Sequence, residues 1–306
     1  MASDGARQQA GGMQTLISTT GTADTAAAST PSDTLARNRD WIRRAPAQDG
    51  VERIEAFFQH NGYALHRHDT YAIGRTLAGV QSFHYRRCVR NSLPGGTMVL
   101  HPDEMHDGQA GTDEGFRYRM IYVEPAVFQA ALGGKPLPFI EGGLSDDPRL
   151  AAATEALLQG IDRAMDPLEQ DDALFDLAHA LDAASGARSI QPLRASADFR
   201  AAQIARDYLH AALDRSVTLD ELATASGRDR WSLSRDFRTF FGTSPHRYLT
   251  MRRLDAARLS MLRGMALVDA AAVAGFADQS HMTRHFVAAY GVTPSRWLRM
   301  LAPQTR

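Results

Sequence analysis

The chain contains a single cysteine, Cys88, so it cannot form a disulfide within itself. Proteins of reducing compartments share this feature, because their thiols are kept reduced. The sequence also lacks an apolar run of about 18 residues, the length typical of a membrane-spanning helix. Its first residues lack the apolar segment of a secretory signal. We therefore expect no membrane association and a cytoplasmic location.

Charges of the two signs nearly cancel over the chain, which has 34 basic and 35 acidic side chains and a net charge of −1. The balance differs between its two parts. Residues 196–306 carry 16 arginines, no lysine and 10 acids, a net charge of +6. Residues 1–195 carry 18 basic and 25 acidic side chains, a net charge of −7. This asymmetry predicts a nucleic-acid partner for the basic part alone.

The length of 306 residues suits two domains and a tail. Ala, Thr, Ser, Gly, Gln and Asp dominate the first 40 residues, and such a composition buries too little apolar surface to offset the entropy of ordering the chain. We expect a disordered tail over 1–48, a β-rich domain over 49–145, a helix pair over 146–187, a linker over 188–197 and a helical domain over 198–303.

A repeat with a spacing of 49 residues dominates the C-terminal third of the chain. Its matched pairs are Arg235 and Arg284, Phe237 and Phe286, Gly242 and Gly291, and Pro245 and Pro294. Self-similarity of this kind indicates one supersecondary unit used twice. Each copy has the pattern of a short helix, a tight turn and a second helix, which is typical of a helix-turn-helix unit.

The first copy contains each element of that unit. Leu219, Leu222 and Ala223 share one face of a helix by their spacing. Gly227 can end that helix in a left-handed conformation. Asp229 is then placed to cap the second helix with its side chain.

The second copy repeats this plan. Val268, Ala271 and Ala272 are expected on the core face of its first helix, Gly275 at the turn and Asp278 at the cap of the second helix. The apolar spacing between the two copies indicates one long connecting helix.

The second helix of each copy has outward side chains that suit a DNA groove. Arg can donate two hydrogen bonds to guanine, Gln can bond to adenine, and Ser or Thr can bond to either. The predicted DNA-contacting residues are Arg230, Trp231, Ser234, Arg235, Arg238, Gln279, Ser280, His281, Thr283 and Arg284. The alternative is an ordinary helical bundle with a solvated basic face, which does not explain why turn, cap and outward arginine recur together.

Residues 199–300 closely resemble the DNA-binding domain of the AraC/XylS transcription regulators. The matching segments are 222–223 with Gly227, 233–237, 242–245 with Tyr248, 253–257, 275–276, 278–281, 284–286 and 291–294. The resemblance implies seven helices and two helix-turn-helix units that contact successive major grooves. It also implies that bases are read by Trp231, Ser234, Arg235, Gln279, Ser280, Thr283 and Arg284.

The part of the chain before the repeat has the signals of a β structure. Short segments rich in β-branched and aromatic residues lie at 71–73, 80–85, 97–100 and 118–123, with Gly, Pro, Asn and Asp between them. This is typical of an all-β barrel or sandwich. Residues 51–58 are compatible with a helix or a strand.

Residues 66–71 and 94–106 resemble the sugar-binding and dimerisation domain of the same regulator family, which is a cupin barrel. The whole chain is therefore predicted to be an α+β multidomain protein. It would combine an N-terminal cupin-like β-barrel and its helix pair with a C-terminal all-α domain of two helix-turn-helix units.

Three histidines in these pieces, His66, His68 and His106, are candidates for a binding site. His66 and His68 would lie on one face of a strand, because side chains alternate. In metal-binding cupins such a pair joins a carboxylate and a later histidine, but here Ala72 and Ile73 stand where the carboxylate is expected. An organic effector pocket, a Zn²⁺ or Fe²⁺ site and structural histidines remain alternatives.

We interpret the histidines foremost as part of an effector pocket, with no catalytic residue, no metal and no cofactor. Other polar side chains on the predicted strands are candidates for the same pocket: Tyr71, Arg75, Tyr85, Arg119 and Tyr122. An arginine there would suit an anionic ligand.

Residues 148–185 return to helical spacing, with Asp166 and Pro167 separating two helices. The predicted apolar positions are Leu150, Ala153, Leu157 and Ile161 on the first helix and Leu174, Leu177, Ala178 and Leu181 on the second. In the resembled family such a pair packs on the barrel and forms a dimer contact. The alternative is that both helices only cover the barrel.

Together these patterns predict a sequence-specific DNA-binding transcription regulator that is not an enzyme. We expect a homodimer that binds promoter DNA, responds to a small-molecule effector and has RNA polymerase as a partner; activation is the commoner role in the resembled family. One alternative is a cupin metalloprotein or metalloenzyme with an accessory helical domain. Another is a constitutive regulator whose barrel only dimerises.

Overall fold

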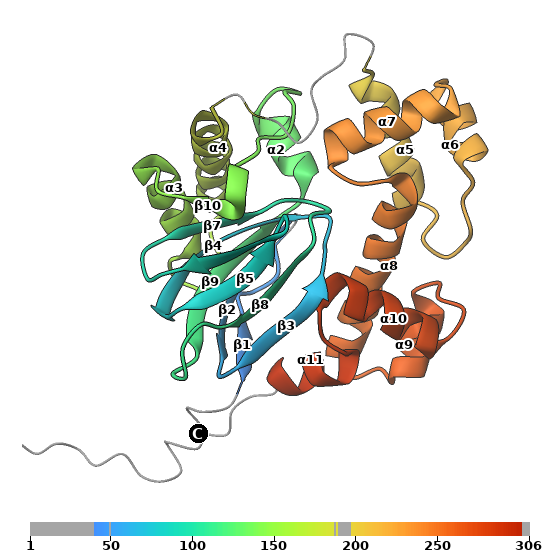
Figure 1. The fold of residues 1–306 in the computed structure, drawn as a ribbon. Coiled ribbons are helices and arrows are strands. Elements are labelled where there is room, and N and C mark those ends of the chain that lie inside the picture. Colours follow the sequence, from blue (N-terminus) through green and yellow to red (C-terminus); the bar gives the residue numbers. More distant parts are fainter. Residues whose placement is uncertain (1–39, 49, 187, 189–196, 302–306) are drawn as a thin grey trace, which may run out of the picture. The chain divides into compact units, whose positions relative to one another are not determined.

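The computed structural model describes residues 40–48, 50–186, 188 and 197–301 (Figure 1). These residues belong to one compact unit. Strands and the helices that cover them occupy residues 41–184, and helices alone occupy residues 199–301. Residues 1–39 of the tail predicted over 1–48, and residues 189–196 of the linker predicted over 188–197, lie outside the described residues.

Two antiparallel sheets make up the β-rich region. One has six strands in the order β1-β2-β9-β4-β7-β10, and the other has four in the order β3-β8-β5-β6. The predicted cupin-like barrel is therefore built from two sheets that pack on each other. The strands are β1 (Trp41–Arg44), β2 (Val51–Phe58), β3 (Asn61–His66), β4 (Tyr71–Gly79), β5 (Gln81–Tyr85), β6 (Cys88–Ser92), β7 (Thr97–Leu100), β8 (His106–Ala110), β9 (Phe116–Val123) and β10 (Leu144–Ser145).

The six-stranded sheet is apolar on both faces. On one face Phe58 and Tyr118 pack in the same core as Phe83 of the other sheet. On the opposite face Ile73 and Ile121 pack against the covering helices. Burial of such a side chain stabilises the fold by about 1.5–3 kcal/mol. Because the sheet is covered on both faces, its strands bury apolar side chains on both sides, and charged side chains such as Glu55 and Arg119 pair with each other on the outer face.

Residues 51–58, for which the sequence leaves helix and strand open, form strand β2. This strand pairs with β9 along its whole length and with β1 on its other edge. The predicted tail boundary at residue 48 is therefore wrong, because Trp41–Arg44 is a strand. The backbone N–H and C=O groups of residues 41–44 find their hydrogen-bond partners on the edge of β2, because neighbouring residues in the chain do not supply them.

Three helices cover the outer face of the six-stranded sheet (Figure 1): α2 (Pro125–Ala131), α3 (Pro148–Leu158) and α4 (Pro167–Ala184). Asp147 and Asp166 cap α3 and α4, each followed by a proline that begins the helix. All the apolar positions predicted for this pair are buried; only Ile161 lies beyond the end of its helix. A short 3₁₀ helix, Glu141–Gly143, precedes β10.

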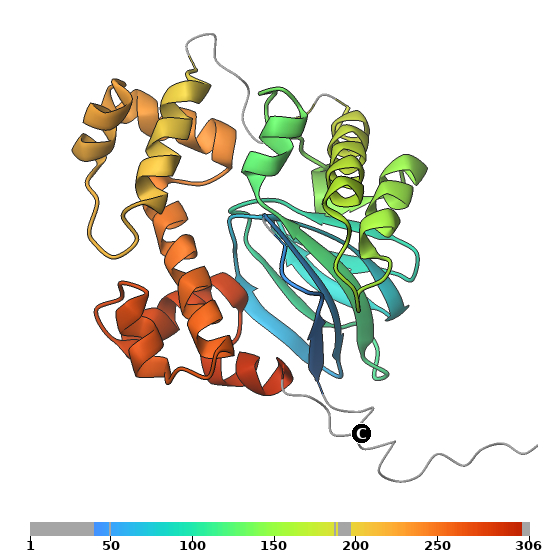
Figure 2. The same cartoon turned by 180° about the vertical axis from the view of Figure 1, so that it is seen from behind.

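Within residues 197–301 the structure has seven helices, as the family resemblance implies: α5 (Phe199–His210), α6 (Leu219–Ser226), α7 (Arg230–Phe241), α8 (Pro245–Leu262), α9 (Leu267–Val273), α10 (Gln279–Tyr290) and α11 (Pro294–Leu301). Helices α6 and α7 form the first helix-turn-helix unit, and α9 and α10 form the second. Helix α8 is the long connection between them, orange in Figure 2.

The predicted turns and caps of both units are confirmed. Gly227 and Gly275 have φ angles of 69° and 80°, the left-handed region that glycine adopts without strain. The carboxylates of Asp229 and Asp278 accept hydrogen bonds from first-turn backbone N–H groups at 3.0 Å and 2.6 Å. Local sequence therefore fixes where the second helix of each unit begins.

The expected core face of α9 is confirmed at Ala271 but wrong at Val268 and Ala272. Val268 is 57% exposed and Ala272 is also exposed, whereas Ala270, Ala271 and Ala274 are buried. In a short helix of small residues the apolar pattern does not distinguish the inner face, because alanine and valine occupy both. Packing against α8 and α10 selects it instead.

Replacing Phe286 by alanine tests the packing of the second unit. This side chain is fully buried and packs against the rings of Tyr290 and Trp297. We expect Phe286→Ala to lower the free energy of unfolding by about 3–5 kcal/mol, because the cavity it leaves cannot fully collapse. Urea unfolding measures the effect. Val273→Ala, at a position 65% exposed, is the control, and equal losses in the two variants would contradict the packing described.

Candidate nucleic-acid interface and ligand cavity

Helix α7 presents a polar face that agrees with the DNA contacts predicted for it. Trp231 is 61% exposed, and Arg230 and Arg235 are exposed beside it. The guanidinium carbon of Arg230 lies 4.9 Å from the centre of the Trp231 ring. Arg238 and Ser234 are half-buried, and the Arg238 guanidinium donates to the Ser234 carbonyl oxygen at 2.9 Å. The outer edge of α7 is therefore formed by Trp231 and two arginines.

Helix α10 presents the corresponding face of the second unit. Gln279, Ser280 and Arg284 are exposed, whereas His281 and Thr283 are half-buried. The His281 ring packs against the rings of Phe276 and His285, with centroid separations of 5.6 Å and 4.7 Å. The His281 ring is thus partly held by packing within its own unit. The most exposed side chains of this face are those of Gln279, Ser280 and Arg284.

The glycines that end these two helices have a second role. Gly242 and Gly291 both have left-handed φ angles, 70° and 67°, which end α7 and α10. Both also touch the β-rich region: a Cβ at Gly242 would lie 2.7 Å from Cβ of Pro102, and one at Gly291 would lie 2.6 Å from the carbonyl oxygen of Ala64. Only glycine allows both approaches.

Backbone hydrogen bonds hold the end of α10 against strand β3. The Ala64 N–H donates to the Gly291 carbonyl oxygen at 3.1 Å, and the Arg67 N–H donates to that of Ala288 at 3.2 Å. The second helix-turn-helix unit is therefore attached to the β-rich region through main-chain groups, close to His66.

Arg252 of α8 makes the most buried ionic contact in the described part of the chain. It is 8% exposed and donates to both carboxylate oxygens of Asp69, at 3.1 Å and 3.2 Å, and to Glu124. Asp255, one helical turn further, lies 3.2 Å away. Burial opposes the charge of Arg252, but these carboxylates hold the pKa of its guanidinium well above the usual range.

Two further arginines of α8 pair with the β-rich region. Arg258 donates to both oxygens of Glu52, at 2.7 Å and 2.8 Å, and Arg44 donates to the same carboxylate at 2.8 Å. Arg247 lies 2.6 Å from Asp103. The sequence did not predict these contacts, because several arginines on one helix are typical of a solvated basic face.

A cavity of about 400 Å³ lies beside these ion pairs. Its walls come from strands β1 to β3 and the loops around them, from Tyr122 and Glu124, and from helices α8, α10 and α11. Its apolar lining includes Ile42, Val51, Ile54, Met251, Leu259, Leu262 and Trp297, and its polar lining includes Arg44, Glu52, His66, His68, Asp69, Tyr122, Arg252, Asp255 and Arg258. A cavity of this size and mixed lining suits a small organic molecule.

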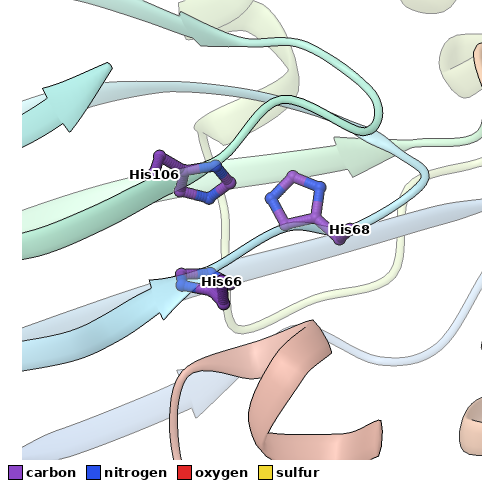
Figure 3. A group of neighbouring side chains, drawn as sticks. All are labelled: His66, His68 and His106. Carbon is purple, nitrogen blue, oxygen red and sulfur yellow. The ribbon is translucent and has the colours of Figure 1, made fainter. Parts of the chain in front are cut away.

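The three predicted histidines converge beside this cavity (Figure 3). His66 ends β3, His68 follows it in the next loop, and His106 begins β8. They are 6%, 4% and 3% exposed, and one ring nitrogen from each lies within 4.8 Å of the others. Burial lowers the pKa of His106 to about 4 and the pKa values of His66 and His68 well below their usual range, so all three are neutral at pH 7.

Tyr71 and Arg75, predicted for the same pocket, lie away from it. The Tyr71 hydroxyl is fully buried and donates to the Pro138 carbonyl oxygen at 2.8 Å. The Arg75 guanidinium donates to the carbonyl oxygens of Ala151 and Gly95, at 3.2 Å and 2.8 Å. Both side chains face the covering helices rather than the cavity, because strand phase, which the sequence left open, sends them to the other side of the sheet.

Of the further pocket candidates, Tyr122 lines the cavity and two others do not. The Tyr85 hydroxyl lies within hydrogen-bonding distance of His101 Nδ1, at 2.5 Å, in the core between the sheets. Arg119 pairs with Glu55 at 2.9 Å.

Two family models match the chain: an AraC-like ligand binding domain over residues 50–178 and a helix-turn-helix domain over residues 222–300. Among the described residues, no helix is long and apolar enough to span a membrane.

Curated relatives are transcriptional regulators, which are not enzymes. The chain is 25% identical over 225 residues to the uncharacterized HTH-type transcriptional regulator YbfI of Bacillus subtilis, a match that covers 71% of this chain and 80% of YbfI. It is 32% identical over 85 residues to the probable transcription factor PqrA of Proteus vulgaris, covering 28% of this chain and 70% of PqrA.

The fold is that of a solved regulator. The structure of ToxT from Vibrio cholerae aligns with a TM-score of 0.61 at 12% identity, covering 83% of this chain and 100% of ToxT. A ToxT structure with bound unsaturated fatty acid aligns with a TM-score of 0.57 at 12% identity, covering 87% of this chain and 97% of ToxT. With a ligand-binding domain followed by paired helix-turn-helix units, this chain belongs to the AraC family of DNA-binding transcription regulators.

Proposed function

We propose that this regulator is controlled by a small organic effector that binds in the cavity beside Arg252 and Arg258. One observation carries the proposal: the walls of that cavity come from the β-rich region and from helices α8, α10 and α11 together. A ligand there contacts the sensing and the DNA-binding parts at once. It therefore favours whichever arrangement of the two binds it better, which is a population shift.

The contacts at the two C-cap glycines support this coupling. Helices α7 and α10 both abut the β-rich region at Gly242 and Gly291. A change at the cavity that alters this docking alters the relative placement of the two reading helices. Two boxes of one operator are recognised only when both helices fit successive major grooves, so their relative placement determines affinity.

A second part of the proposal concerns the role of the protein at the promoter. We propose that it acts as an activator through contact with RNA polymerase, in line with the commoner role in its family. In vitro transcription from an operator-bearing promoter distinguishes activation from repression: added protein raises the transcript yield if it activates and lowers the yield if it represses.

The DNA-reading face is tested at Arg284. This side chain is exposed on α10, and a guanidinium there can donate two hydrogen bonds to guanine. We expect Arg284→Ala to weaken specific binding by about 1–3 kcal/mol, measured by fluorescence anisotropy on an operator selected from fragments of the source genome. Arg163→Ala, at an exposed position remote from both reading helices, is the matched control. Unchanged operator affinity would remove Arg284 from the reading set.

The effector is proposed to be an organic acid with an apolar body. Ile42, Met251 and Leu262 provide an apolar lining, and the guanidiniums of Arg44 and Arg258 share the Glu52 carboxylate at its wall. A ligand carboxylate can replace Glu52 on that pair. The unsaturated fatty acid bound by ToxT, which has the same fold, has this chemistry.

Oleic acid is a suitable probe for this site. We expect it to raise the thermal unfolding temperature in a concentration-dependent way, because binding to the folded state alone stabilises it by mass action. Leu259→Trp should abolish the rise, since Leu259 lines the cavity and a larger ring would fill it. Val273→Trp, on an exposed surface of α9, should retain it. An equal response in both variants would show that oleic acid does not bind in this cavity.

Dimerisation is proposed to use the outer face of α4. Leu168 and Phe175 on this helix are 68% and 52% exposed, although large apolar side chains are usually covered. We expect Phe175→Glu to weaken self-association by about 2 kcal/mol or more, roughly 30-fold, measured by sedimentation equilibrium. Val273→Glu is the control. A dimer of undiminished stability in Phe175→Glu would place the contact on another surface.

A further inference from the structure

His66, His68 and His106 form a cluster that differs from His101, the other buried histidine among the described residues. His66 and His106 are directly opposed partners in the β3–β8 ladder, and their ring centres lie 4.3 Å apart. The His68 ring lies 4.8 Å from that of His106 and 6.0 Å from that of His66. Two strands and a loop therefore bring three imidazoles together, as Figure 3 shows.

Each histidine uses the same ring nitrogen for a structural hydrogen bond. The Nδ1 atoms of His66, His68 and His106 lie 2.7, 2.9 and 2.9 Å from the backbone carbonyl oxygens of Ala64, Thr70 and Glu104. A carbonyl oxygen can only accept, so each Nδ1 carries the hydrogen. The lone pair of each neutral ring is then on Nε2.

Among the described residues, no protein donor satisfies these three Nε2 atoms. His101 shows the contrast within the same region: its Nδ1 faces the Tyr85 hydroxyl, and its Nε2 accepts from the Ile140 N–H at 2.9 Å. His101 is thus a buried histidine with a structural role for both nitrogens. The three clustered histidines each keep one basic nitrogen without such a hydrogen bond, and His66 and His68 also line the cavity.

This arrangement has the form of a metal site before the metal binds. Metal-ligating histidines commonly donate their other ring N–H to a backbone carbonyl, which fixes the tautomer and the ring orientation. All three rings here have that outer contact. With the hydrogen on Nδ1, each neutral imidazole has its lone pair on Nε2, and this is the form that binds a metal.

We propose that His66, His68 and His106 bind one divalent transition-metal ion of the Zn²⁺ or Fe²⁺ class through their Nε2 atoms. Imidazole suits Zn²⁺, Fe²⁺, Cu²⁺ and Ni²⁺, whereas Mg²⁺ and Ca²⁺ require oxygen ligands. Three histidines without a carboxylate suffice for a protein zinc site with one position left open.

The open position would face the cavity, which His66 and His68 line. Bonds of about 2.0–2.1 Å to a tetrahedral ion place two ligand nitrogens roughly 3.4 Å apart. One ring nitrogen of each histidine lies within 4.8 Å of those of the others, so the rings would reach that geometry by turning inward when the ion binds. Because a Cβ at Gly291 would lie 2.9 Å from Nδ1 of His66, the site also adjoins the end of α10.

The test uses metal-free, full-length protein purified without a histidine tag. Zn²⁺ is titrated in competition with a chromophoric chelator, and Co²⁺ is added separately to record its visible absorption. His281 and His285 form a second, surface pair of histidines with facing Nε2 atoms 2.9 Å apart. All measurements are therefore made in a His285→Ala background, so that this pair cannot supply the signal.

We expect one Zn²⁺ per chain and a Co²⁺ spectrum typical of four-coordinate geometry. His106→Ala should lower the affinity by at least about 100-fold, since loss of an outer contact alone costs about 10–100-fold. His84→Ala, at a half-exposed position with a 2.8 Å contact to Asp107, should leave it unchanged. Circular dichroism checks that each variant is folded, and His68→Gln replaces His106→Ala if the latter is not.

Absence of stoichiometric binding by the parent protein would overturn the proposal without reference to any variant. So would binding that folded His106→Ala or His68→Gln retains in full. The metal site goes beyond effector control and does not depend on it: operator affinity, measured by anisotropy on the same preparations, reports separately whether the regulator is functional.

Discussion

The arrangement of the whole protein depends on one buried arginine. Removing a guanidinium from water costs several kcal/mol unless carboxylates surround it. Arg252 on α8 finds Asp69 and Glu124 on the β-rich region and Asp255 on its own helix. If the two parts separated, a charge on each side would lose its partner. This contact therefore favours one way of joining the β-rich region and the helix-turn-helix units, and the proposed effector would change that preference from the cavity beside it.

The repeat has a different meaning once the structure is known. Gly242 and Gly291 recur because each ends a reading helix in a left-handed conformation. Each also lies against the β-rich region, at Pro102 and Ala64. The two helix-turn-helix units are thus positioned by a common support as well as by the helix between them. The proposed fit of both units to successive grooves would depend on such a support, because small rotations of one helix move its side chains off the base edges.

The β-rich region contains structural side chains and the side chains that line the cavity, and its sequence does not distinguish the two groups. Its six-stranded sheet is apolar on both faces, one for the partner sheet and one for the helices, so most of its side chains are structural. One group of polar side chains lies at the edge near β3, where the clustered histidines meet the cavity. His101 resembles them in sequence and in burial, but both of its nitrogens have partners. The environment of each nitrogen, rather than the residue type, distinguishes a structural histidine from a ligand.

The sequence by itself determined the features that depend on local rules: the two helix-turn-helix units with their caps, and the exposure of several polar side chains on α7 and α10. It also indicated that His66, His68 and His106 lie near one another. Turns, caps and helical periodicity involve neighbours within a few residues, so a single sequence shows them. Tertiary structure decided the phase of α9, the removal of Tyr71 and Arg75 from the pocket, and the pairing of the α8 arginines with Asp69 and Glu52. Those outcomes depend on which surface meets which. The arginine pairs join residues 183 and 206 positions apart, and the partners of Tyr71 and Arg75 lie 67 and 76 positions away, so burial and charge compensation set them only when both surfaces are in place.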